Sequence, residues 1–340
     1  MLLDVSHLRK YFYLSTGFLK RGQTSVQAVD DVTFGVDRGE TLGIVGESGC
    51  GKSTLARLII RLIHPDAGEV RLGGQTVGGE LAIREMRRAI QMVFQDSYSS
   101  LNPRLSIEES VAFAPAVHGD SRRAAARRAH EILAQVGLDP AQFAHRYPHE
   151  LSGGQRQRVN IARALALLPQ IVILDEAVSA LDKSVEAQVL NLLMELKREF
   201  DLTYLFISHD LNVVNYMSDR VLVMYLGKVV EIGPADRIAE GGTHPYTRAL
   251  YSAMPSMDPD QRVTEPPLSG DPPNPINPPS GCRFHPRYPF AEPVCVDTEP
   301  SLYDMPAAAG YQVACHMVIP SSGHTGTNAP SPTTTEQHAC

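Results

Sequence analysis

The stretch "TLGIVGESGCGKSTLARLII", residues 41–60, decides the fold of this chain. Residues 41–46 form a short apolar run that ends in glycine, as a buried parallel strand does. Residues 53–63 carry apolar side chains at helical spacing. Between them, Gly46 is followed by four residues and then by Gly51, Lys52 and Ser53. This is the phosphate-loop pattern in the strand–loop–helix context that it requires, so the sequence predicts a phosphate-binding loop here.

The residue types of this loop suit phosphate chemistry. Glycines allow backbone N–H groups to curl around phosphate oxygens, and the helix N-terminus adds positive potential. We expect Lys52 to reach the β- and γ-phosphates and Ser53 to hold Mg²⁺. A dinucleotide loop of the GxGxxG type does not fit, because Lys-Ser follows the glycines. The expected nucleotide-binding residues of the loop are Gly46, Glu47, Ser48, Gly49, Cys50, Gly51, Lys52, Ser53 and Thr54.

Composition excludes several classes of protein. The 340-residue chain has a net charge of −7, which argues against a nucleic-acid partner. No apolar run is long enough to span a bilayer, and Asp4 and His7 interrupt the N-terminal residues where a signal peptide needs an apolar core. Five cysteines are too few for a disulfide scaffold, so we expect a cytoplasmic, reducing environment.

Strand-like and helix-like segments alternate along the chain. Residues 89–95, 171–176 and 203–210 resemble buried strands, and residues 185–200 form a helical pattern between the last two. Such repeats predict an α/β fold, a parallel sheet with helices on both faces. Residues 104–145 are helical and rich in Arg and Ala, and we interpret the basic helix "SRRAAARRAHE", residues 121–131, as a solvated face rather than a nucleic-acid patch. The Pro-rich residues 264–281 indicate a linker, and the low-complexity residues 321–340 predict a disordered tail.

Two carboxylates follow a buried strand at "IVILDE", residues 171–176. Asp175 and Glu176 emerge at the carboxyl edge of the sheet, where open α/β sheets bind ligands. We expect Asp175 to hold Mg²⁺ and Glu176 to orient or deprotonate an attacking water.

A second candidate anion site begins at Leu151, in "LSGGQRQRVNIARAL". Ser152, Gly153 and Gly154 precede a helix that is predicted to start near Gln155. Standing alone, this stretch would be a turn and cap before an amphipathic helix. Its position between the phosphate loop and the Asp-Glu strand favours a functional role.

Six motifs in this order resemble those of the ATP-binding subunits of ABC transporters, over residues 1 to about 250. They are the phosphate loop at 46–54, Gln95 of the Q-loop, the signature Leu151, Ser152, Gly153, Gly154 and Gln155, the pair Asp175 and Glu176, the D-loop Ser179, Ala180, Leu181 and Asp182, and His209 of the switch. The resemblance implies a P-loop NTPase with a RecA-like parallel sheet and a helical subdomain at about residues 96–158. It also implies ATP and Mg²⁺ as ligands.

The resemblance assigns a role to each motif. Two subunits meet head to tail, and Ser-Gly-Gly of one contacts the γ-phosphate held by the other. Gln95 touches Mg²⁺ or the water and relays the nucleotide state to membrane subunits, while His209 grips the γ-phosphate. Phe12 is expected to stack on the adenine, with Tyr11 as the alternative.

Further stretches resemble the dipeptide/oligopeptide branch and its F-type subunit, which pairs with a D-type one. They are "DEAVSALD", "FQDSYSSLNPR", "THPYTRAL" and "GCRFHPR". The family often has Asp-Glu-Pro-Thr where this chain has Ala177 and Val178 after the carboxylates. Nickel and glutathione importers share this branch, so the solute stays open.

The branch implies a domain plan and a set of partners. Residues 1–250 form the nucleotide-binding domain, residues 251–320 the peptide-importer extension with its linker, and residues 321–340 the tail. Expected partners are a D-type ATPase in a heterodimer, two transmembrane permease subunits and an extracytoplasmic solute-binding protein. The chain is then peripheral, on the cytoplasmic face of the membrane.

Three rival functions were weighed against this one. A non-transport ABC ATPase usually carries two cassettes or a long coiled-coil insertion, and this chain has neither. A P-loop kinase does not need the Leu-Ser-Gly-Gly-Gln motif. A metal-binding or redox module rests only on the late cysteines.

Those late cysteines lie in the extension that begins with "GCRFHPRYPFAEPVC" at residues 281–295. The resemblance implies that this extension often has four cysteines, which in some members of the branch hold a [4Fe–4S] cluster. Cys282, Cys295 and Cys315 match three of the places, and Tyr288 stands at the fourth. A labile cluster with one open iron is one interpretation. We favour the other, a Pro-pinned clasp that folds back on the ATPase or its partner, with the cysteines as small buried side chains. The reducing compartment disfavours a disulfide.

Overall fold

The computed structural model describes residues 1–14, 24–254, 274–306 and 308–328. Its centre is an eight-stranded sheet in the order β11-β12-β10-β9-β3-β8-β7-β6. The strands β9, β3, β8, β7 and β6 pair in parallel, as the alternating strand and helix patterns predict. The strands of this sheet are β3 (Thr41–Val45), β6 (Ile90–Val93), β7 (Ile171–Asp175), β8 (Thr203–Ile207), β9 (Arg220–Tyr225), β10 (Lys228–Pro234), β11 (Tyr303–Asp304) and β12 (Gln312–Val313).

A second, antiparallel sheet of four strands has the order β2-β1-β4-β5. Its strands are β1 (Leu3–Leu14), β2 (Thr24–Val36), β4 (Ala67–Leu72) and β5 (Gln75–Thr76). No pattern in the sequence predicted this sheet. Buried residues alternate along the second half of β2, where one face of the strand packs on the core.

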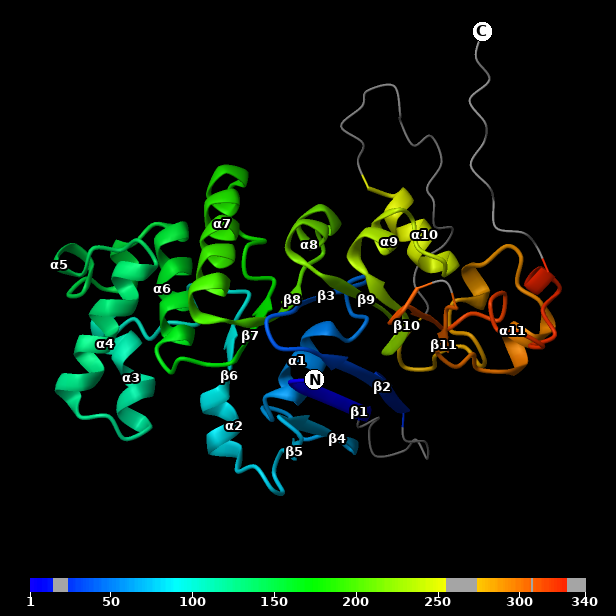
Figure 1. Cartoon of the computed structure of the whole chain (residues 1–340), viewed down its shortest axis with the longest axis horizontal. Coiled ribbons are helices and arrows are strands. Elements are labelled where there is room, and N and C mark those ends of the chain that lie inside the picture. The colour runs from blue at the N-terminus through cyan, green and yellow to red at the C-terminus, as the bar shows by residue number, and fades with distance from the viewer. Residues whose placement is uncertain (15–23, 255–273, 307, 329–340) are drawn as a thin grey trace, which may run out of the picture.

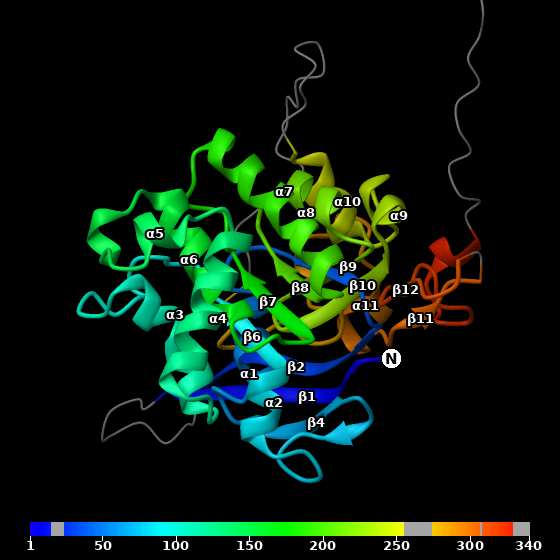
Figure 2. The same ribbon diagram turned by 60° about the vertical axis from the view of Figure 1, so that its left-hand side comes forward.

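Helices cover both faces of the central sheet, as predicted. Figure 2 shows α1 and α2 between the central sheet and the antiparallel sheet, and α6, α7 and α8 on the opposite face. The helices are α1 (Lys52–Ile59), α2 (Ile83–Ala89), α3 (Ile107–Val117), α4 (Arg122–Gln135), α5 (Pro140–Phe143), α6 (Gly153–Leu165), α7 (Lys183–Phe200), α8 (Leu211–Met217), α9 (Ala235–Ala239), α10 (Pro245–Ser252) and α11 (Pro293–Asp297). The helix α1 ends before the predicted end at residue 63, because Arg61 adopts a left-handed backbone conformation with φ 53°.

Two hydrophobic cores lie on the two faces of the central sheet. One contains α1, α2 and the antiparallel sheet, and includes Leu3, Leu55 and Met86. The other contains α6 and α7 and extends into α3 and α4. Figure 1 shows α3, α4, α5 and α6 grouped at one end of the molecule, opposite the C-terminal residues.

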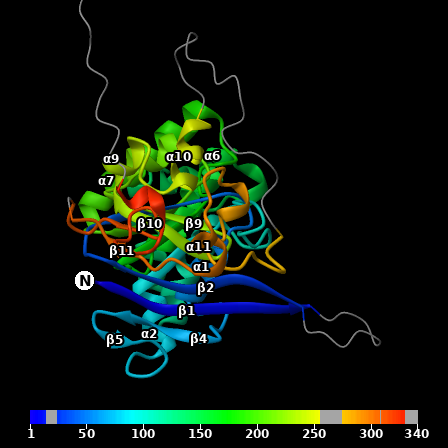
Figure 3. The ribbon, with the colours of Figure 1, turned by 90° about the vertical axis from the view of Figure 1, so that its right-hand side faces the viewer.

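The C-terminal residues join the central sheet. The strand β12 pairs antiparallel with β10, and β11 pairs with β12, so residues 303–304 and 312–313 extend the sheet at its edge. Figure 3, viewed from this side, shows β11 and α11 lying beside β10 and above β1 and β2. The residues predicted as an extension are therefore bound to the nucleotide-binding domain by backbone hydrogen bonds as well as by side chains.

The first residues of the predicted tail contact the extension. Residues 321–328 are held by hydrogen bonds: Ser322 Oγ donates to the His316 carbonyl at 2.7 Å, and the Thr325 N–H donates to the Glu292 carboxylate at 3.0 Å. Ser322 and Thr325 therefore have partners in the extension, while the disorder expected for residues 321–340 stays a prediction. Residues 329–340 of the predicted tail, and residues 264–273 of the predicted linker, lie outside the described residues. Within the described ranges, no helix has the length and apolar character needed to cross a membrane.

Candidate nucleotide-binding site

A cavity of about 540 Å³ opens at the start of α1, at the carboxyl ends of the parallel strands. It brings together residues that are as far apart in the sequence as Phe12 and His209, and that come from both sheets. Its lining consists of Phe12, Val26, Ala28, Ser48, Gly49, Gly51, Lys52, Ser53, Thr54, Gln95, Glu176 and His209. Most of these residues were predicted from separate motifs, and the fold collects them around one space.

The phosphate loop owes its shape to two glycines that no other residue can replace. A Cβ on Gly46 would lie 2.2 Å from the Met224 carbonyl oxygen, and a Cβ on Gly51 would lie 2.1 Å from that of Ala28. Both glycines have positive φ, 147° and 111°. Close backbone approach and left-handed conformation both require glycine here. Gly49 also has positive φ, at 78°, but faces open space.

Lys52 and Ser53 lie at the first turn of α1. The Lys52 ammonium is buried and donates to the carbonyl oxygens of Gly46 at 2.7 Å and Glu47 at 3.0 Å. Ser53 Oγ donates to Asp175 Oδ1 at 2.9 Å, so the loop and the end of β7 are joined directly. Burial raises the pKa of Asp175, and the Ser53 hydrogen bond opposes this shift. A hydroxyl and a carboxylate, both hard oxygen donors, are the ligand types that Mg²⁺ prefers.

Glu176 is surrounded by the other polar residues of the cavity. Gln95 Nε2 donates to Glu176 Oε2 at 2.7 Å, and His209 Nδ1 lies 3.6 Å from the same oxygen. The backbone of Glu176 has a positive φ of 48° and its N–H donates to the Ile207 carbonyl at 2.9 Å. This carboxylate therefore stands at the turn after β7, between the Q-loop and switch residues.

The two candidate adenine-stacking residues point to different places. Phe12 is half-exposed and lines the cavity. Tyr11 is absent from the lining and donates its hydroxyl to Asp30 Oδ1 at 2.5 Å. Adjacent strand residues face opposite sides, so only Phe12 presents its ring to the cavity.

The signature and the D-loop lie outside the cavity lining. Ser152 caps α6, where its Oγ accepts from the Gln155 N–H at 3.3 Å and its N–H donates to Gln155 Oε1 at 3.0 Å. Leu151 is buried, whereas Ser152 is exposed at the helix N-terminus. In the D-loop, Ser179 Oγ donates to the Glu176 carbonyl at 3.0 Å. The remaining predicted members of these motifs are Gly153, Gly154, Ala180, Leu181 and Asp182, and none lines the cavity.

Known protein families and relatives match most of the length of this chain. A family described as "ABC transporter" matches residues 29–179, and one described as "Oligopeptide/dipeptide transporter, C-terminal region" matches residues 230–295. The "Oligopeptide transport ATP-binding protein AppF" of Bacillus subtilis is 48% identical over 93% of this chain and 97% of that protein. The chain belongs to the ATP-binding proteins of ABC transporters.

Two further relatives agree with this assignment. The "Probable peptide ABC transporter ATP-binding protein y4tS" of Sinorhizobium fredii is 50% identical over 94% of this chain and 91% of that protein. The ATP-binding cassette MJ0796, solved as a dimer in a post-hydrolysis state with ADP and Pi, aligns with a TM-score of 0.59 and 29% identity. That alignment covers 69% of this chain and 99% of the cassette. The chain is therefore an ATPase with the P-loop NTPase fold of ABC cassettes.

ABC ATPase domains bind ATP with Mg²⁺, and the residues of this cavity fit both ligands. Lys52 and the loop amides supply positive groups for phosphates, and the 2.9 Å contact between Ser53 and Asp175 supplies paired oxygens for the metal. Bound Mg²⁺ neutralises charge on the phosphate oxygens. Cys50 of the loop is buried, and burial raises its pKa, so it acts as a packed thiol beside Lys52.

The late cysteines of this ABC ATPase do not fit an iron–sulfur cluster. Cys282, Cys295 and Cys315 border a cavity of about 10 Å³, which is close to the smallest space that holds one water. The fourth place is filled by Tyr288, whose hydroxyl lies 2.8 Å from Met317 Sδ. Burial raises the pKa of Cys282 to about 11 and that of Cys315 to about 12, which favours thiols over the thiolates that iron needs.

The predicted clasp on the ATPase is confirmed instead. Phe284 packs against Tyr225 and Tyr246, with ring centroids 5.5 Å apart in each pair. Arg287 reaches the phosphate loop, where it donates to the Glu47 carboxylate at 3.0 Å and 3.1 Å. The Glu47 N–H donates to the Tyr246 hydroxyl at 2.8 Å.

Sequence reasoning missed several of these contributors. Val26 and Ala28 line the cavity from β2, a strand that was not predicted. Tyr246 was quoted only as part of a branch motif, although it touches the phosphate loop. Nothing in the sequence pattern linked either feature to the nucleotide site.

Proposed function

We propose that this chain is the ATP-hydrolysing subunit of an importer for di- or oligopeptides. In this proposal it lies peripherally on the cytoplasmic face of the membrane and pairs with a D-type ATPase subunit. Two permease subunits and an extracytoplasmic solute-binding protein complete the transporter. Supporting relatives carry names of peptide or oligopeptide transport ATP-binding proteins over more than nine-tenths of this chain. Nickel and glutathione are not favoured by those names.

One observation carries the proposal for how the subunit works. The phosphate loop, Gln95, Glu176 and His209 line one cavity, whereas Ser152 lies outside that lining at the start of α6. A signature that does not serve its own cavity is available to a second subunit. We assign Ser152 to Gln155 to the γ-phosphate held by the paired subunit, in a head-to-tail dimer.

The cavity residues then divide the reaction among them. Lys52 binds the β- and γ-phosphates, while Ser53 and Asp175 hold Mg²⁺. Glu176 takes a proton from the attacking water or orients it, and Gln95 fixes the carboxylate through the 2.7 Å contact. His209, 3.6 Å from Glu176, is assigned to the γ-phosphate, and Phe12 to the adenine. Ser179 and the rest of the D-loop follow Glu176 directly and face the second subunit.

A pair of serine variants tests the shared site. Ser152 and Ser121 are both helix N-caps, at α6 and α4, and each accepts a hydrogen bond from the backbone N–H three positions on. Losing either cap costs about 1 kcal/mol of stability. We expect Ser152→Ala to leave MgATP binding by the isolated chain unchanged and to lower ATP turnover of the assembled transporter, while Ser121→Ala changes neither. Equal turnover in both variants would contradict the assignment of the signature to the paired subunit.

The substrate class is tested separately. We expect ATP turnover of the assembled transporter to rise when its binding protein is loaded with a peptide of two to five residues, and not with Ni²⁺ or glutathione. A rise with Ni²⁺ or glutathione alone would replace peptide as the solute and leave the ATPase assignment in place.

A further inference from the structure

Two arginines of the C-terminal extension form ion pairs with residues that are close in sequence to the lining of the nucleotide cavity. Arg283 and Arg287 lie on either side of Pro286 and are both buried. Arg287 pairs with Glu47 of the phosphate loop. Arg283 pairs with Asp30 of β2, in the hairpin that carries Phe12 and Tyr11.

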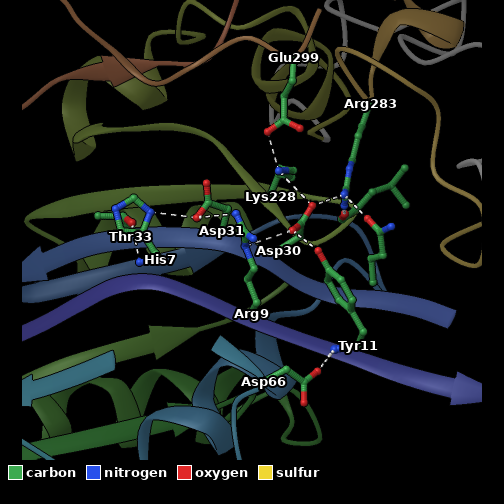
Figure 4. Close-up of polar contacts among 12 residues, drawn as sticks. His7, Arg9, Tyr11, Asp30, Asp31, Thr33, Asp66, Lys228, Arg283 and Glu299 are labelled. Carbon is green, nitrogen blue, oxygen red and sulfur yellow. Dashed lines mark hydrogen bonds and ion pairs between the residues drawn. The ribbon is translucent and has the colours of Figure 1, made fainter. Parts of the chain in front are cut away.

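The Asp30 cluster fixes the extension on the β1–β2 hairpin. Figure 4 shows Asp30 at the centre, approached by Arg283, Lys228 and Tyr11. Tyr11 donates its hydroxyl to Asp30 at 2.5 Å, and Lys228 Nζ lies 3.0 Å from the same carboxylate. Lys228 also reaches Glu299 of the extension. Because this carboxylate is buried and accepts several charged donors, the extension has a defined position against the hairpin.

From that position, Arg287 holds Glu47, a loop residue that does not line the nucleotide cavity. The Arg287 guanidinium donates to both Glu47 oxygens, at 3.1 Å and 3.0 Å, and to the Tyr225 hydroxyl at 3.4 Å. The Arg287 side chain is only 6% exposed, whereas that of Glu47 is 22% exposed, so the ion pair is partly buried. Glu47 separates Gly46 from Ser48, and Ser48 lines the cavity.

The backbone of Glu47 is constrained as well. Its N–H donates to the Tyr246 hydroxyl at 2.8 Å, and its carbonyl accepts from Lys52 Nζ at 3.0 Å. The side chain, the N–H and the carbonyl of Glu47 each have a partner. A shift of Glu47 would therefore move both the loop backbone and the contact of Lys52.

We propose that the C-terminal extension positions the phosphate loop for ATP through the ion pair between Arg287 and Glu47, with Arg283 anchoring the extension on the β1–β2 hairpin. Arg287 is a positioning residue, since it contacts the loop from outside the cavity. The inference rests on the proposed ATPase function and adds a role for the extension. A preorganised loop loses less freedom when ATP binds, and affinity rises accordingly.

The test measures MgATP affinity of the isolated full-length chain and its melting temperature. We expect Arg287→Ala to raise the Kd for MgATP about tenfold, within the usual range of coupling between sites. Arg287→Lys keeps the charge without the planar guanidinium, and should restore part of the affinity. Arg287→Ala combined with Glu47→Gln should bind no more weakly than the weaker single variant, because both remove the same contact.

A matched variant separates positioning from general stability. Tyr311 donates its hydroxyl to buried Glu231 at 2.5 Å and does not touch the phosphate loop. Tyr311→Phe should lower the melting temperature and leave the Kd for MgATP unchanged. If Arg287→Ala does not fold, Glu47→Gln takes its place, with the same expected rise in Kd.

Two results would overturn the proposal. One is a Kd for Arg287→Ala, or for Glu47→Gln, that stays within about twofold of the wild-type value. The other is a rise in Kd for Tyr311→Phe as large as that for Arg287→Ala, which would mean that the extension contributes only to general stability. Wild-type chain that does not bind MgATP would overturn the proposed function itself, and this inference with it.

Discussion

Replacing Glu176 by glutamine isolates the proton-accepting role that we assign to this residue. The substitution keeps the size of the side chain. It also keeps an oxygen that can accept the hydrogen bond from Gln95 Nε2, which lies 2.7 Å from Glu176 Oε2 in the wild-type chain. It removes only the negative charge and the ability to take a proton. The ligands that we assign to phosphate and Mg²⁺, namely Lys52, Ser53 and Asp175, are left in place.

The expected size of the effect follows from these contacts. A general base contributes about 10²–10⁴-fold to rate, so turnover should fall by at least about 100-fold. That loss corresponds to about 2.7 kcal/mol or more in activation free energy. The Glu176 side chain is partly exposed, at 20%, and keeps its partner, so the free energy of unfolding should change by no more than about 0.5 kcal/mol.

The assay compares MgATP turnover of the assembled transporter with MgATP binding by the isolated chain. Glu195→Gln serves as a matched control, because Glu195 is an exposed carboxylate on α7 outside the cavity lining. We expect near wild-type affinity for both variants and a turnover loss only for Glu176→Gln. Turnover within about threefold of wild type in the Glu176→Gln transporter would refute the general-base assignment. A turnover loss accompanied by an equal loss of MgATP affinity would instead mean that Glu176 acts in binding.

Three further variants test other parts of the account. Phe12→Ala should raise the Kd for MgATP at least about fivefold, because base–aromatic stacking is worth about 1–3 kcal/mol. Tyr13→Ala, at the exposed neighbouring residue, should leave the Kd unchanged, and equal effects of the two variants would contradict the assignment of Phe12 to the adenine. Gly51→Ala should abolish MgATP binding, because Gly51 has a φ of 111° and the added Cβ would lie 2.1 Å from the Ala28 carbonyl oxygen. Gly49→Ala places its Cβ in open space and should retain more MgATP binding. Weaker binding by Gly49→Ala than by Gly51→Ala would contradict the loop geometry. Burial lowers the pKa of His244 to about 3, so as pH falls the imidazole is protonated in the unfolded chain before it is protonated in the folded chain. The free energy of unfolding should therefore fall as pH drops below 6.5, by up to about 1.4 kcal/mol per pH unit. In His244→Gln that part of the slope should vanish in acid melts, and an unchanged slope would rule out His244 as its source.

The features that the sequence predicted are those that short local patterns encode. Buried strands such as β3 and β7 are short apolar runs, and the phosphate loop has a fixed spacing in a strand–helix context. The order of the motifs then placed Gln95, Glu176 and His209 in one site before their geometry was known.

The parts that were missed depend on pairing over long distances. The strand β1 contacts both β2 and β4 with shifts in register near Leu8, which blur the alternation that marks a strand. Arg287 and Glu47 are 240 positions apart in the sequence, and no periodicity links them. The tail was expected to begin at residue 321 because composition alone reports polarity, whereas the partners of Ser322 and Thr325 come from folded neighbours.

The most direct test of the central claim is peptide uptake by a transporter reconstituted in lipid vesicles. The vesicles contain the two permease subunits, the D-type ATPase, the peptide-loaded binding protein and this chain on the side where MgATP is supplied. We predict that labelled peptide crosses the membrane only when MgATP and this chain are both present, and that Glu176→Gln in this chain lowers the rate by at least about 100-fold. Equal uptake without this chain, or with no MgATP, would contradict the claim that its nucleotide cavity powers peptide import.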